Sequence, residues 1–278
     1  MNLEKTILIT GASSGIGHYC ATRLHQEGYK VIASCRKLRD VSRLQAEGLT
    51  CIQLDLADSD SIHSAVSKTL SLTGGNLYAL FNNGAYGQPG AVEDLSREVL
   101  RQQFETNLFG WHELTRLLLP VMHAQGYGRI VQNSSVLGFA AMPFRGAYTA
   151  SKFALEGLTD TLRLELAGTG IHISLIEPGP ILSRFRSNAL AALEANVDMN
   201  NSRFRDAYQQ TLARLKKEGP AARFTLGPEA VYARLRHALK ANRPRPRYYV
   251  TFPTYLSGFL KRILSTRMMD KLLQKGSR

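Results

Sequence analysis

The sequence predicts an α/β protein in which one doubly wound, parallel sheet of seven strands is followed by an amphipathic C-terminal extension. Short β-branched or apolar runs alternate with longer amphipathic segments, which is typical of a parallel sheet with helices on both faces. A glycine-rich turn links the first of these runs to the first helical segment. The 278 residues include 44% hydrophobic and 21% charged positions, so the chain can bury its own core. We therefore expect a single domain before the extension.

The strands are expected in runs rich in β-branched and apolar residues: Thr6–Thr10, Lys30–Ser34, Thr50–Leu54, Leu77–Phe81, Gly128–Asn133, His172–Ile176 and Tyr248–Thr251. Between them, amphipathic periodicity predicts helices over Gly15–Glu27, Ser59–Leu72, Arg97–Ala124, Ala147–Ala167 and Pro228–Ala241. Right-handed crossovers place the carboxyl ends of parallel strands along one edge of the sheet, where ligands bind.

Residues 182–226 interrupt this alternation. The segment is polar, rich in Arg, Asn and Gln, and its pattern predicts a helix over Arg203–Glu218. A long insertion at the ligand edge of a sheet is more often a lid or substrate loop than a structural element. We expect this segment to cover a binding site.

The net charge of +13 raises the question of an anionic partner. Basic residues become denser after Arg234, but no interleaved aromatic residues or zinc-finger spacing accompany them, so we expect no nucleic acid partner. Cys20, Cys35 and Cys51 lack CxxC spacing, which indicates reduced thiols and no metal site. No apolar run reaches the ~20 residues of a membrane span, and no signal-peptide pattern precedes the first strand. We expect a cytoplasmic protein.

The glycine-rich turn has the spacing Gly11-x3-Gly15-x-Gly17. Gly11 permits a tight turn, Gly15 lets the backbone approach a pyrophosphate, and Gly17 lets the helix pack closely on the strand. Free N–H groups at the start of the helix favour phosphates. The pattern predicts a dinucleotide site of the Rossmann fold. The expected binding residues of this turn are Gly11, Ser13, Ser14, Gly15, Ile16 and Gly17.

The same turn also fits Gly-x-Ser-x-Gly, the nucleophile elbow of α/β-hydrolases, with Ser13 as the nucleophile. An elbow needs an earlier strand and loop to complete its oxyanion hole, and the chain before Gly11 is too short to supply both. A serine hydrolase is therefore the less favoured alternative.

The end of the second strand indicates which nicotinamide cofactor binds. NAD enzymes usually place a carboxylate there to bind the ribose hydroxyls, whereas this chain has Cys35-Arg36-Lys37. Arg36 can bind a 2′-phosphate with its planar fork and Lys37 as a point charge, which predicts NADP(H). The alternative is a solvated basic pair. Asp55, after the third strand, is placed either to accept a hydrogen bond from the adenine or to cap the turn before Ser59.

Tyr148 and Lys152 lie four residues apart on an expected helix and so share one face. A free tyrosine titrates near pH ~10, and a neighbouring ammonium favours the phenolate and lowers that pKa. Tyr148 can then act as a general acid or base. Ser135, at the end of a strand, can donate a hydrogen bond to a substrate carbonyl.

These residues occur in the order and spacing of the short-chain dehydrogenase/reductases. The glycine turn, Asn82-Asn83, Asn107, Ser135, Tyr148-x3-Lys152 and Pro178-Gly179 carry the resemblance, which extends over about residues 4–252. The chain most resembles NADP-preferring members of the 17-beta-hydroxysteroid and retinol dehydrogenase type.

The resemblance implies a role for each motif. Tyr148 would be the acid/base, Lys152 would lower its pKa and bind the nicotinamide ribose, Ser135 would polarise the carbonyl, and Asn107 would hold a water that links Lys152 to solvent. Asn82 would steady the sheet beside the adenosine, although Gly84-Ala85 reverses the family's Ala-Gly order. The segment expected to line the nicotinamide contains Pro178, Gly179, Ile181 (by its backbone) and Ser183, which replaces the family's usual threonine.

The resemblance implies a hydride transfer between NADP(H) and a carbonyl or alcohol. An apolar stretch that includes Val136, Leu137, Phe139, Met142, Pro143 and Phe144 fits a lipophilic substrate such as a steroid, retinoid, aldehyde or ketone, or is ordinary packing under a lid. A cofactor-binding sensor or scaffold without turnover is the alternative function. A homo-oligomer through Arg97–Ala124 and Ala147–Ala167 is also expected.

We expect residues 1–252 to form the catalytic domain and 253–278 a basic amphipathic tail. From Tyr255, apolar residues recur at helical spacing with cations mostly between them: Leu256, Phe259, Leu260, Ile263, Leu264, Met268 and Leu272 with Lys261, Arg262, Arg267, Lys271 and Lys275. Such a helix suits the surface of an anionic membrane, here the inner surface, or docks on the chain itself or on a partner subunit.

Overall fold

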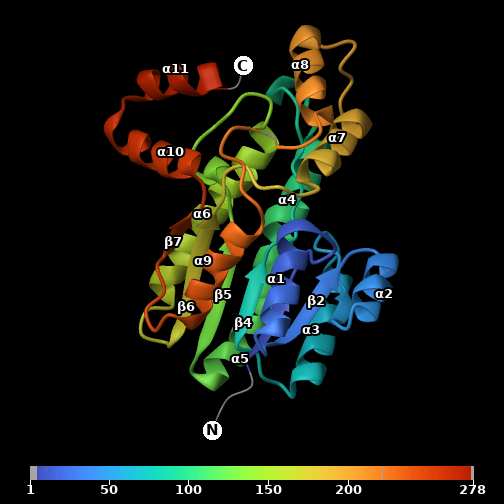
Figure 1. Cartoon of the computed structure of the whole chain (residues 1–278), viewed down its shortest axis with the longest axis vertical. Coiled ribbons are helices and arrows are strands. Elements are labelled where there is room, and N and C mark those ends of the chain that lie inside the picture. Colours follow the sequence, from blue (N-terminus) through green and yellow to red (C-terminus); the bar gives the residue numbers. More distant parts are fainter. Residues whose placement is uncertain (1–4, 221, 277–278) are drawn as a thin grey trace.

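Seven parallel strands form one sheet in the order β3-β2-β1-β4-β5-β6-β7 (Figure 1). This computed structural model describes residues 5–220 and 222–276. The strands are β1 (Thr6–Ile9), β2 (Lys30–Cys35), β3 (Thr50–Gln53), β4 (Ala79–Asn82), β5 (Gly128–Asn133), β6 (Ile171–Glu177) and β7 (Arg247–Tyr249). The doubly wound α/β sheet expected from the sequence is therefore confirmed.

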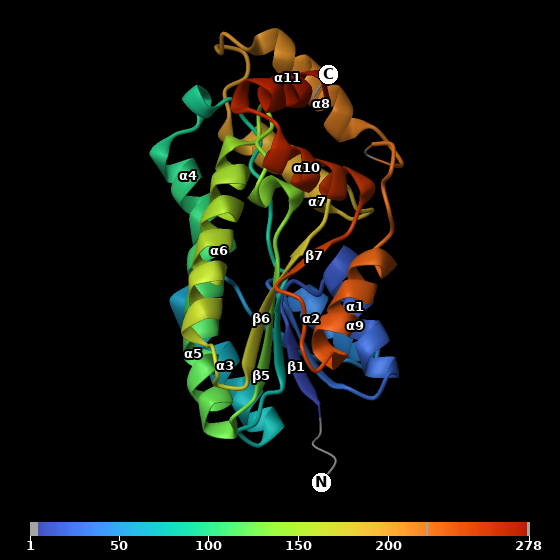
Figure 2. The same ribbon diagram turned by 90° about the vertical axis from the view of Figure 1, so that its left-hand side faces the viewer.

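Helices cover both faces of the sheet (Figure 2). One face carries α1 (Gly15–Gln26), α2 (Leu38–Ala46) and α9 (Glu229–Lys240), whose apolar side chains form one buried cluster with β1 and β2. The other carries α3 (Ser59–Thr73), α5 (Gly110–Gln125) and α6 (Gly146–Glu165), which form a second cluster. The strands read as nearly continuous apolar runs because side chains are buried on both faces.

The strand order reverses between β1 and β4. The chain runs outward from β1 through β2 to β3 and then returns to place β4 on the other side of β1. The loops that follow β1 and β4 therefore lead away from each other at the carboxyl ends of these two strands. Doubly wound sheets bind ligands in the space between such loops. The topology places the glycine-rich turn and Asn82-Asn83 together at this point.

The structure corrects one predicted helix and adds another. The expected helix Arg97–Ala124 is broken into α4 (Arg97–Phe104), a π-helical turn over Glu105–Phe109 and α5. Its amphipathic pattern is continuous, so the break is visible only in the backbone hydrogen bonds. The helix α2 was not predicted, although Leu38, Val41 and Leu44 recur at a spacing of three residues and the last two are buried. Nine residues are a short window in which to recognise that pattern.

The segment 182–226 contains two helices, α7 (Phe185–Asn196) and α8 (Arg205–Lys216), of which only the second was expected. They pack on each other over Leu193 and Tyr208 in a third apolar cluster. Figure 1 shows both helices above the carboxyl edge of the sheet. The segment is therefore a folded cover rather than an open loop.

The C-terminal tail forms two helices, α10 (Phe252–Ile263) and α11 (Thr266–Gly276). In Figure 2, α10 crosses above β7 and α9. The small residues Thr254 and Gly258 of α10 are buried, while Phe259 and Ile263 are both 61% exposed. The large apolar residues of the tail therefore face outward. Among the described helices, none is long and apolar enough to cross a membrane.

Two glycines inside helices have opposite surroundings and give a matched pair of substitutions. A Cβ at Gly110 would collide with the carbonyl oxygen of Leu56, whereas a Cβ at Gly157 meets nothing within 4 Å. We expect Gly110→Ala to lower the free energy of unfolding by about 1–3 kcal/mol, because two backbones must separate. We expect Gly157→Ala to raise it by about 0.5–1 kcal/mol. Urea unfolding measures both, and equal effects would contradict this account.

Candidate active site

The glycine-rich turn follows β1 and begins α1. Gly11 and Gly15 have φ values of 67° and 56°, a backbone conformation that glycine adopts without strain. A Cβ at Gly17 would collide with the carbonyl oxygen of Gly11, and a Cβ at Gly15 would lie 2.9 Å from Cβ of Ser183. Among the described residues, no side chain caps the N-terminus of α1 at Ser14. The first N–H groups of α1 are therefore available to a ligand.

Asn83 joins three strand ends. Its Nδ2 donates to the carbonyl oxygens of Thr10 (3.0 Å) and Gly11 (3.3 Å), and its Oδ1 accepts from Nδ2 of Asn133 (2.9 Å). Asn82 is fully buried and donates instead to Oγ1 of Thr115 (3.1 Å). Both asparagines stabilise the sheet at the reversal point, but Asn83 holds the glycine turn directly.

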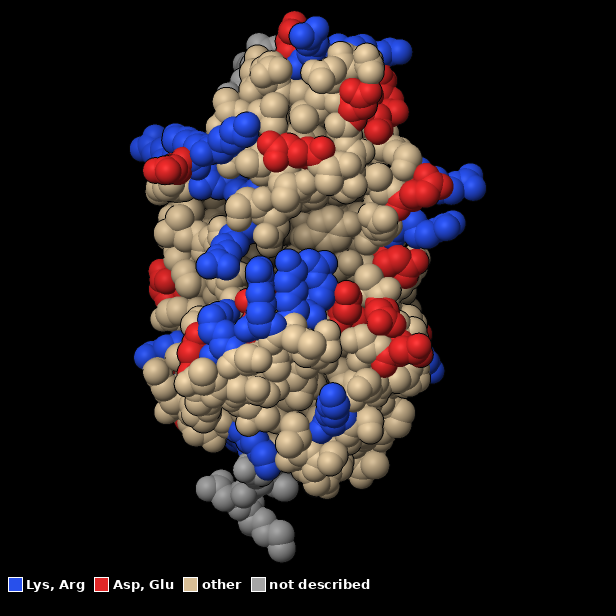
Figure 3. All heavy atoms as spheres, turned by 90° about the vertical axis from the view of Figure 1, so that its right-hand side faces the viewer, with Lys and Arg blue, Asp and Glu red and all other residues tan. Residues whose placement is uncertain are grey.

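The exposed edge after β2 is basic. Arg36 and Lys37 precede α2, and no described carboxylate forms an ion pair with either of them, whereas Arg43 of α2 donates through Nη2 to the carbonyl oxygen of Ser13 (2.6 Å). Figure 3, turned toward the side that carries α2, shows Lys and Arg side chains gathered beside a hollow. A positive edge of this kind favours an anionic group.

Asp55, which follows β3, and the segment after β6 both lie at the carboxyl edge of the sheet. Oδ1 of Asp55 accepts from the backbone N–H of Ala57 (3.0 Å), while Asp58 is the residue that caps α3. Asp55 therefore caps the turn that leads into α3, as the alternative interpretation expected, and Asp58 caps the helix itself. Gly179 packs against Thr251, and the carbonyl oxygen of Pro178 accepts from the N–H of Val136 (2.8 Å).

The following residues connect that segment to the cover. Ile181 pairs with Leu226 in an isolated bridge, and the N–H of Leu182 donates to the carbonyl oxygen of Leu226 (2.9 Å). The hydroxyl oxygen of Ser183 accepts from the N–H of Phe185 at the start of α7 (3.3 Å). The segment 178–183 is thereby held between β6 and α7.

Ser135 and Tyr148 lie near each other at the carboxyl edge. Ser135 follows β5, is 8% exposed, and its hydroxyl accepts from the N–H of Leu137 (3.1 Å). Burial raises the pKa of Tyr148 to about 12, although Ser135 and the charge of Arg145 act to lower it. The lowering of this pKa that the sequence led us to expect from Lys152 is not found, and the phenol is protonated at neutral pH.

Lys152 lies one helical turn beyond Tyr148 and is fully buried. Its Nζ donates to the carbonyl oxygen of Asn133 (2.8 Å) and lies 4.1 Å from the ring centroid of Trp111 and 5.8 Å from that of Tyr148. Burial lowers the pKa of Lys152 to about 7, and the charge of Glu156 opposes this shift. The π-face of Trp111 compensates part of the lost hydration of the ammonium.

Asn107 lies in the π-helical turn, a distortion that is frequent at functional sites. Its Nδ2 donates to the carbonyl oxygen of Tyr86 (2.8 Å), and its Oδ1 accepts from the N–H of the same residue (3.2 Å). Its Nδ2 also lies 3.4 Å from Oγ of Ser151, the neighbour of Lys152 on α6. Asn107 therefore fixes the loop after β4 beside the turn of α6 that carries Lys152.

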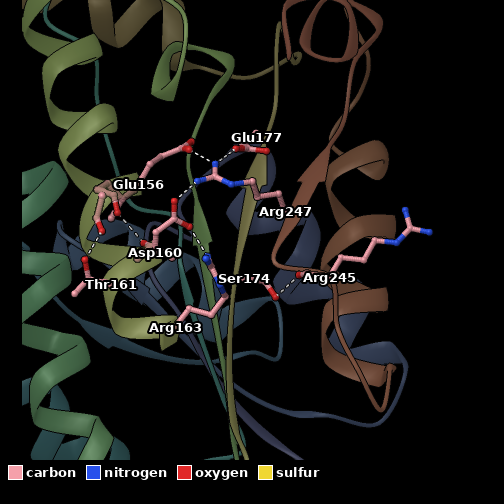
Figure 4. A network of polar contacts seen from close by, with 11 residues as sticks. Glu156, Asp160, Thr161, Arg163, Ser174, Glu177, Arg245 and Arg247 are labelled. Carbon is pink, nitrogen blue, oxygen red and sulfur yellow. Dashed lines mark hydrogen bonds and ion pairs between the residues drawn. The ribbon is translucent and has the colours of Figure 1, made fainter. Parts of the chain in front are cut away.

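Glu156 connects the site to a group of charges between α6, β6 and β7 (Figure 4). Its Oε1 accepts from Oγ of Ser134 (2.7 Å), and its Oε2 pairs with Arg247. Arg247 also binds Glu177 (2.5 Å) and Asp160 (2.6 Å). Burial and the neighbouring Glu156 raise the pKa of Glu177 to about 8. The network fixes the loop that carries Ser135 against the helix that carries Lys152.

Some of the apolar residues expected near a substrate pack on the protein instead. Leu137 is buried, Phe139 stacks on Tyr249 with ring centroids 5.5 Å apart, and Phe144 packs against Tyr208 of the cover. Phe185 of α7 packs its ring 5.3 Å from that of Tyr148. The apolar wall nearest the candidate acid/base therefore comes from the cover. No described histidine forms a hydrogen bond to Ser13, so the geometry gives the elbow alternative no base.

Three residues of the site were not assigned these contacts from the sequence. Trp111 supplies the ring under Lys152, Glu156 the buried acid beyond it, and Asn83 the link between strand ends. An acid four residues after a functional lysine was a visible signal for Glu156. The sequence held no comparable signal for Trp111.

The arrangement fits a dinucleotide. The glycine turn leaves the N-terminus of α1 open, a cationic edge lies after β2, and Ser135, Tyr148 and Lys152 converge where β5 and α6 meet. Comparison with known proteins agrees. The family model described as short chain dehydrogenase matches residues 5–194.

Two curated relatives align with nearly the whole chain or most of it. The uncharacterized oxidoreductase YbbO of Escherichia coli (strain K12) is 45% identical over 272 residues, which cover 98% of this chain and 95% of that protein. Human 17-beta-hydroxysteroid dehydrogenase type 1 is 35% identical over 257 residues, covering 88% of this chain and 77% of that protein.

A solved structure agrees in fold. A short chain dehydrogenase/reductase from Burkholderia phymatum, in complex with NAD, superimposes with a TM-score of 0.78 at 26% identity and covers 99% of this chain and 97% of that one. The sequence match, the relatives and the fold therefore agree, and the chain belongs to the short-chain dehydrogenase/reductase family of oxidoreductases.

Proposed function

We propose that the protein transfers a hydride between NADP(H) and a carbonyl or alcohol of a lipophilic substrate, with Tyr148 as the acid/base. The observation that carries this proposal is the position of Tyr148, which interacts with Ser135 and whose ring centroid lies 5.8 Å from the buried Nζ of Lys152. When bound, the nicotinamide supplies or accepts the hydride. The protein's own residues orient the carbonyl and move the proton.

The pKa values support a definite proton path. Tyr148 is protonated because burial raises its pKa to about 12, so it can donate a proton to a carbonyl oxygen during reduction. The phenolate left behind is stabilised by Ser135 and by the charge of Lys152. Glu156 favours the charged form of Lys152 and so supports this role. Asn107 is proposed to order a water between Lys152 and solvent.

Removing one hydroxyl tests the acid/base assignment. We expect Tyr148→Phe to lower kcat for NADPH-dependent reduction by about 10²–10⁴-fold, because the proton donor is lost, and to leave NADPH affinity nearly unchanged. Turnover of a panel of steroid ketones, retinoids and aliphatic aldehydes measures kcat. Fluorescence titration measures the affinity for NADPH. Tyr127→Phe, a substitution of a tyrosine that lies before β5, is the matched control. Equal turnover in the two variants would remove Tyr148 from the mechanism.

The preference for NADP(H) rests on this chain's own residues, since the solved relative from Burkholderia phymatum is in complex with NAD. Arg36 and Lys37 follow β2 directly, at the place where NAD enzymes usually carry a carboxylate, and no described acid pairs with either. Two uncompensated cations favour a 2′-phosphate over a hydroxyl.

A double substitution tests this preference. We expect Arg36→Ala with Lys37→Ala to weaken NADPH binding by about 10–100-fold, because charge-assisted hydrogen bonds to the 2′-phosphate are lost, and to change NADH binding little. Fluorescence titration with NADPH and with NADH gives the dissociation constant of each cofactor and the ratio of the two. Arg23→Ala, an exposed arginine of α1, is the control. Tighter binding of NADH than of NADPH by the unsubstituted protein would contradict the proposal.

A lipophilic substrate is supported by the rim of the site. Phe185, Phe224 and Leu182 of the cover are between 37% and 47% exposed, and Phe185 contacts Tyr148. One relative is named for a hydroxysteroid, a lipophilic alcohol. A homo-oligomer through α5 and α6 stays a prediction, supported by the exposed Phe153, Leu158 and Leu164 of α6.

We also propose that α10 and α11 rest on an anionic membrane surface. The apolar side chains of both helices face outward, and cations flank them: Phe259, Ile263, Met268 and Leu272 with Lys261, Arg262, Arg267 and Lys271. This combination of apolar area and positive charge complements anionic lipid. This contact would bring the entrance of the candidate active site close to lipophilic substrate dissolved in the membrane.

Polar substitution on the exposed side of α10 tests the contact. We expect Phe259→Asn with Ile263→Asn to reduce cosedimentation with phosphatidylglycerol vesicles severalfold, because the apolar area available for insertion is lost. Leu72→Asn, at the end of α3, is the matched exposed apolar control. If the double variant dissociates an oligomer and sediments unchanged, the surface binds a partner subunit instead.

A further inference from the structure

A cavity of about 330 Å³ lies between α9, β7 and α10 and is lined by four arginines: Arg234, Arg245, Arg247 and Arg262. We call it the four-arginine pocket. Its other polar lining residues are His237, Tyr248, Tyr249 and Tyr255. No aspartate or glutamate lines it. The pocket differs from the candidate active site, because none of Ser135, Tyr148 and Lys152 lines it.

Three of the four arginines of this pocket have no described carboxylate partner. Arg247 is turned inward to Glu156, Glu177 and Asp160, whereas Figure 4 shows the guanidinium of Arg245 extending away from that group. Within residues 5–220 and 222–276, no carboxylate pairs with Arg234, Arg245 or Arg262. Like charges around one cavity repel each other unless an anion lies between them.

The walls of the pocket are held in place by contacts of their own. Arg234 donates through Nε to the carbonyl oxygen of Tyr249 (3.3 Å), and its Nη2 lies 3.5 Å from the hydroxyl of Tyr255 on α10. Gly258 packs its backbone on the ring of Tyr249, and Lys261 donates to the carbonyl oxygen of Phe139 (2.6 Å). The position of α10 over β7 is therefore determined by packing, and the pocket exists without a ligand.

Hydrogen-bonding groups also face the cavity. Nδ1 of His237 lies 2.8 Å from the hydroxyl of Tyr248, which accepts from the N–H of Arg245 (2.9 Å). Burial raises the pKa of Tyr248, and the charge of Arg245 acts to lower it. Burial and the charge of Glu177 raise the pKa of Tyr249, while the charges of Arg262 and Arg247 act to lower it.

We propose that the four-arginine pocket binds a phosphoryl group. Guanidinium groups bind phosphate in a bidentate manner, and several of them around one cavity compensate its charge of about −2. The cavity has room for such a group with a short organic substituent. The proposal goes beyond hydride transfer and does not depend on it.

The phosphoryl group can belong to a free phosphate ester or to the headgroup of a phospholipid. Arg262 and Tyr255 come from α10, where the exposed Phe259 lies one helical turn after Tyr255 and the exposed Ile263 directly follows Arg262. A lipid headgroup in the pocket would therefore have its acyl chains beside these apolar side chains. Both sources need the same arginines, so one set of variants tests them.

Calorimetry on the full-length protein tests the site, with saturating NADPH present to occupy the glycine turn and the basic edge after β2. Pyrophosphate is titrated in one arm, and vesicles of phosphatidylglycerol or of phosphatidylcholine in the other, at constant ionic strength. We expect Arg234→Gln with Arg245→Gln to weaken binding of the phosphoryl probe at least about tenfold, because two charged hydrogen-bond donors are lost.

Arg236→Gln is the matched control, because Arg236 lies on the same helix, is exposed and pairs with Glu27 outside the pocket. Unchanged NADPH turnover in all variants shows that the fold is intact. Saturable binding of pyrophosphate that is lost in the double variant supports a soluble ligand. A loss seen only with phosphatidylglycerol supports a lipid headgroup. Binding that is absent, or equal in the double and control variants, overturns the proposal.

Discussion

The buried ammonium of Lys152 is the constraint around which the site is built. A charge without exposure to water is costly unless polar groups replace its hydration, and here the Asn133 carbonyl, the Trp111 ring and the charge of Glu156 do so. Each partner comes from a different element. β5, α5 and α6 must therefore pack in one arrangement for the lysine to be tolerated, and this arrangement also brings Tyr148 to Ser135.

The sequence predicted those features that depend on local pattern. β5 was predicted with the bounds that the structure has, because its β-branched run ends sharply at Asn133. The positions of Ser135, Tyr148 and Lys152 at one sheet edge followed from topology. The π-helical turn at Asn107 was not predicted, because the amphipathic pattern runs through it without a break.

Features that depend on contacts between distant segments could not be predicted from the sequence. The pKa of Tyr148 was expected to be lowered by Lys152, but burial raises it, and Phe185 of α7, far along the chain, packs on its ring. The four-arginine pocket draws its residues from α9, β7 and α10, so the density of cations after Arg234 only hinted at it.

The ring of Phe224 in the cover lies 5.0 Å from that of Phe252, the first residue of α10. This contact joins the first turn of α10 to the segment 182–226, and Phe185 of the same segment packs against Tyr148. The tail is thereby connected, by direct packing, to the segment that borders the candidate acid/base.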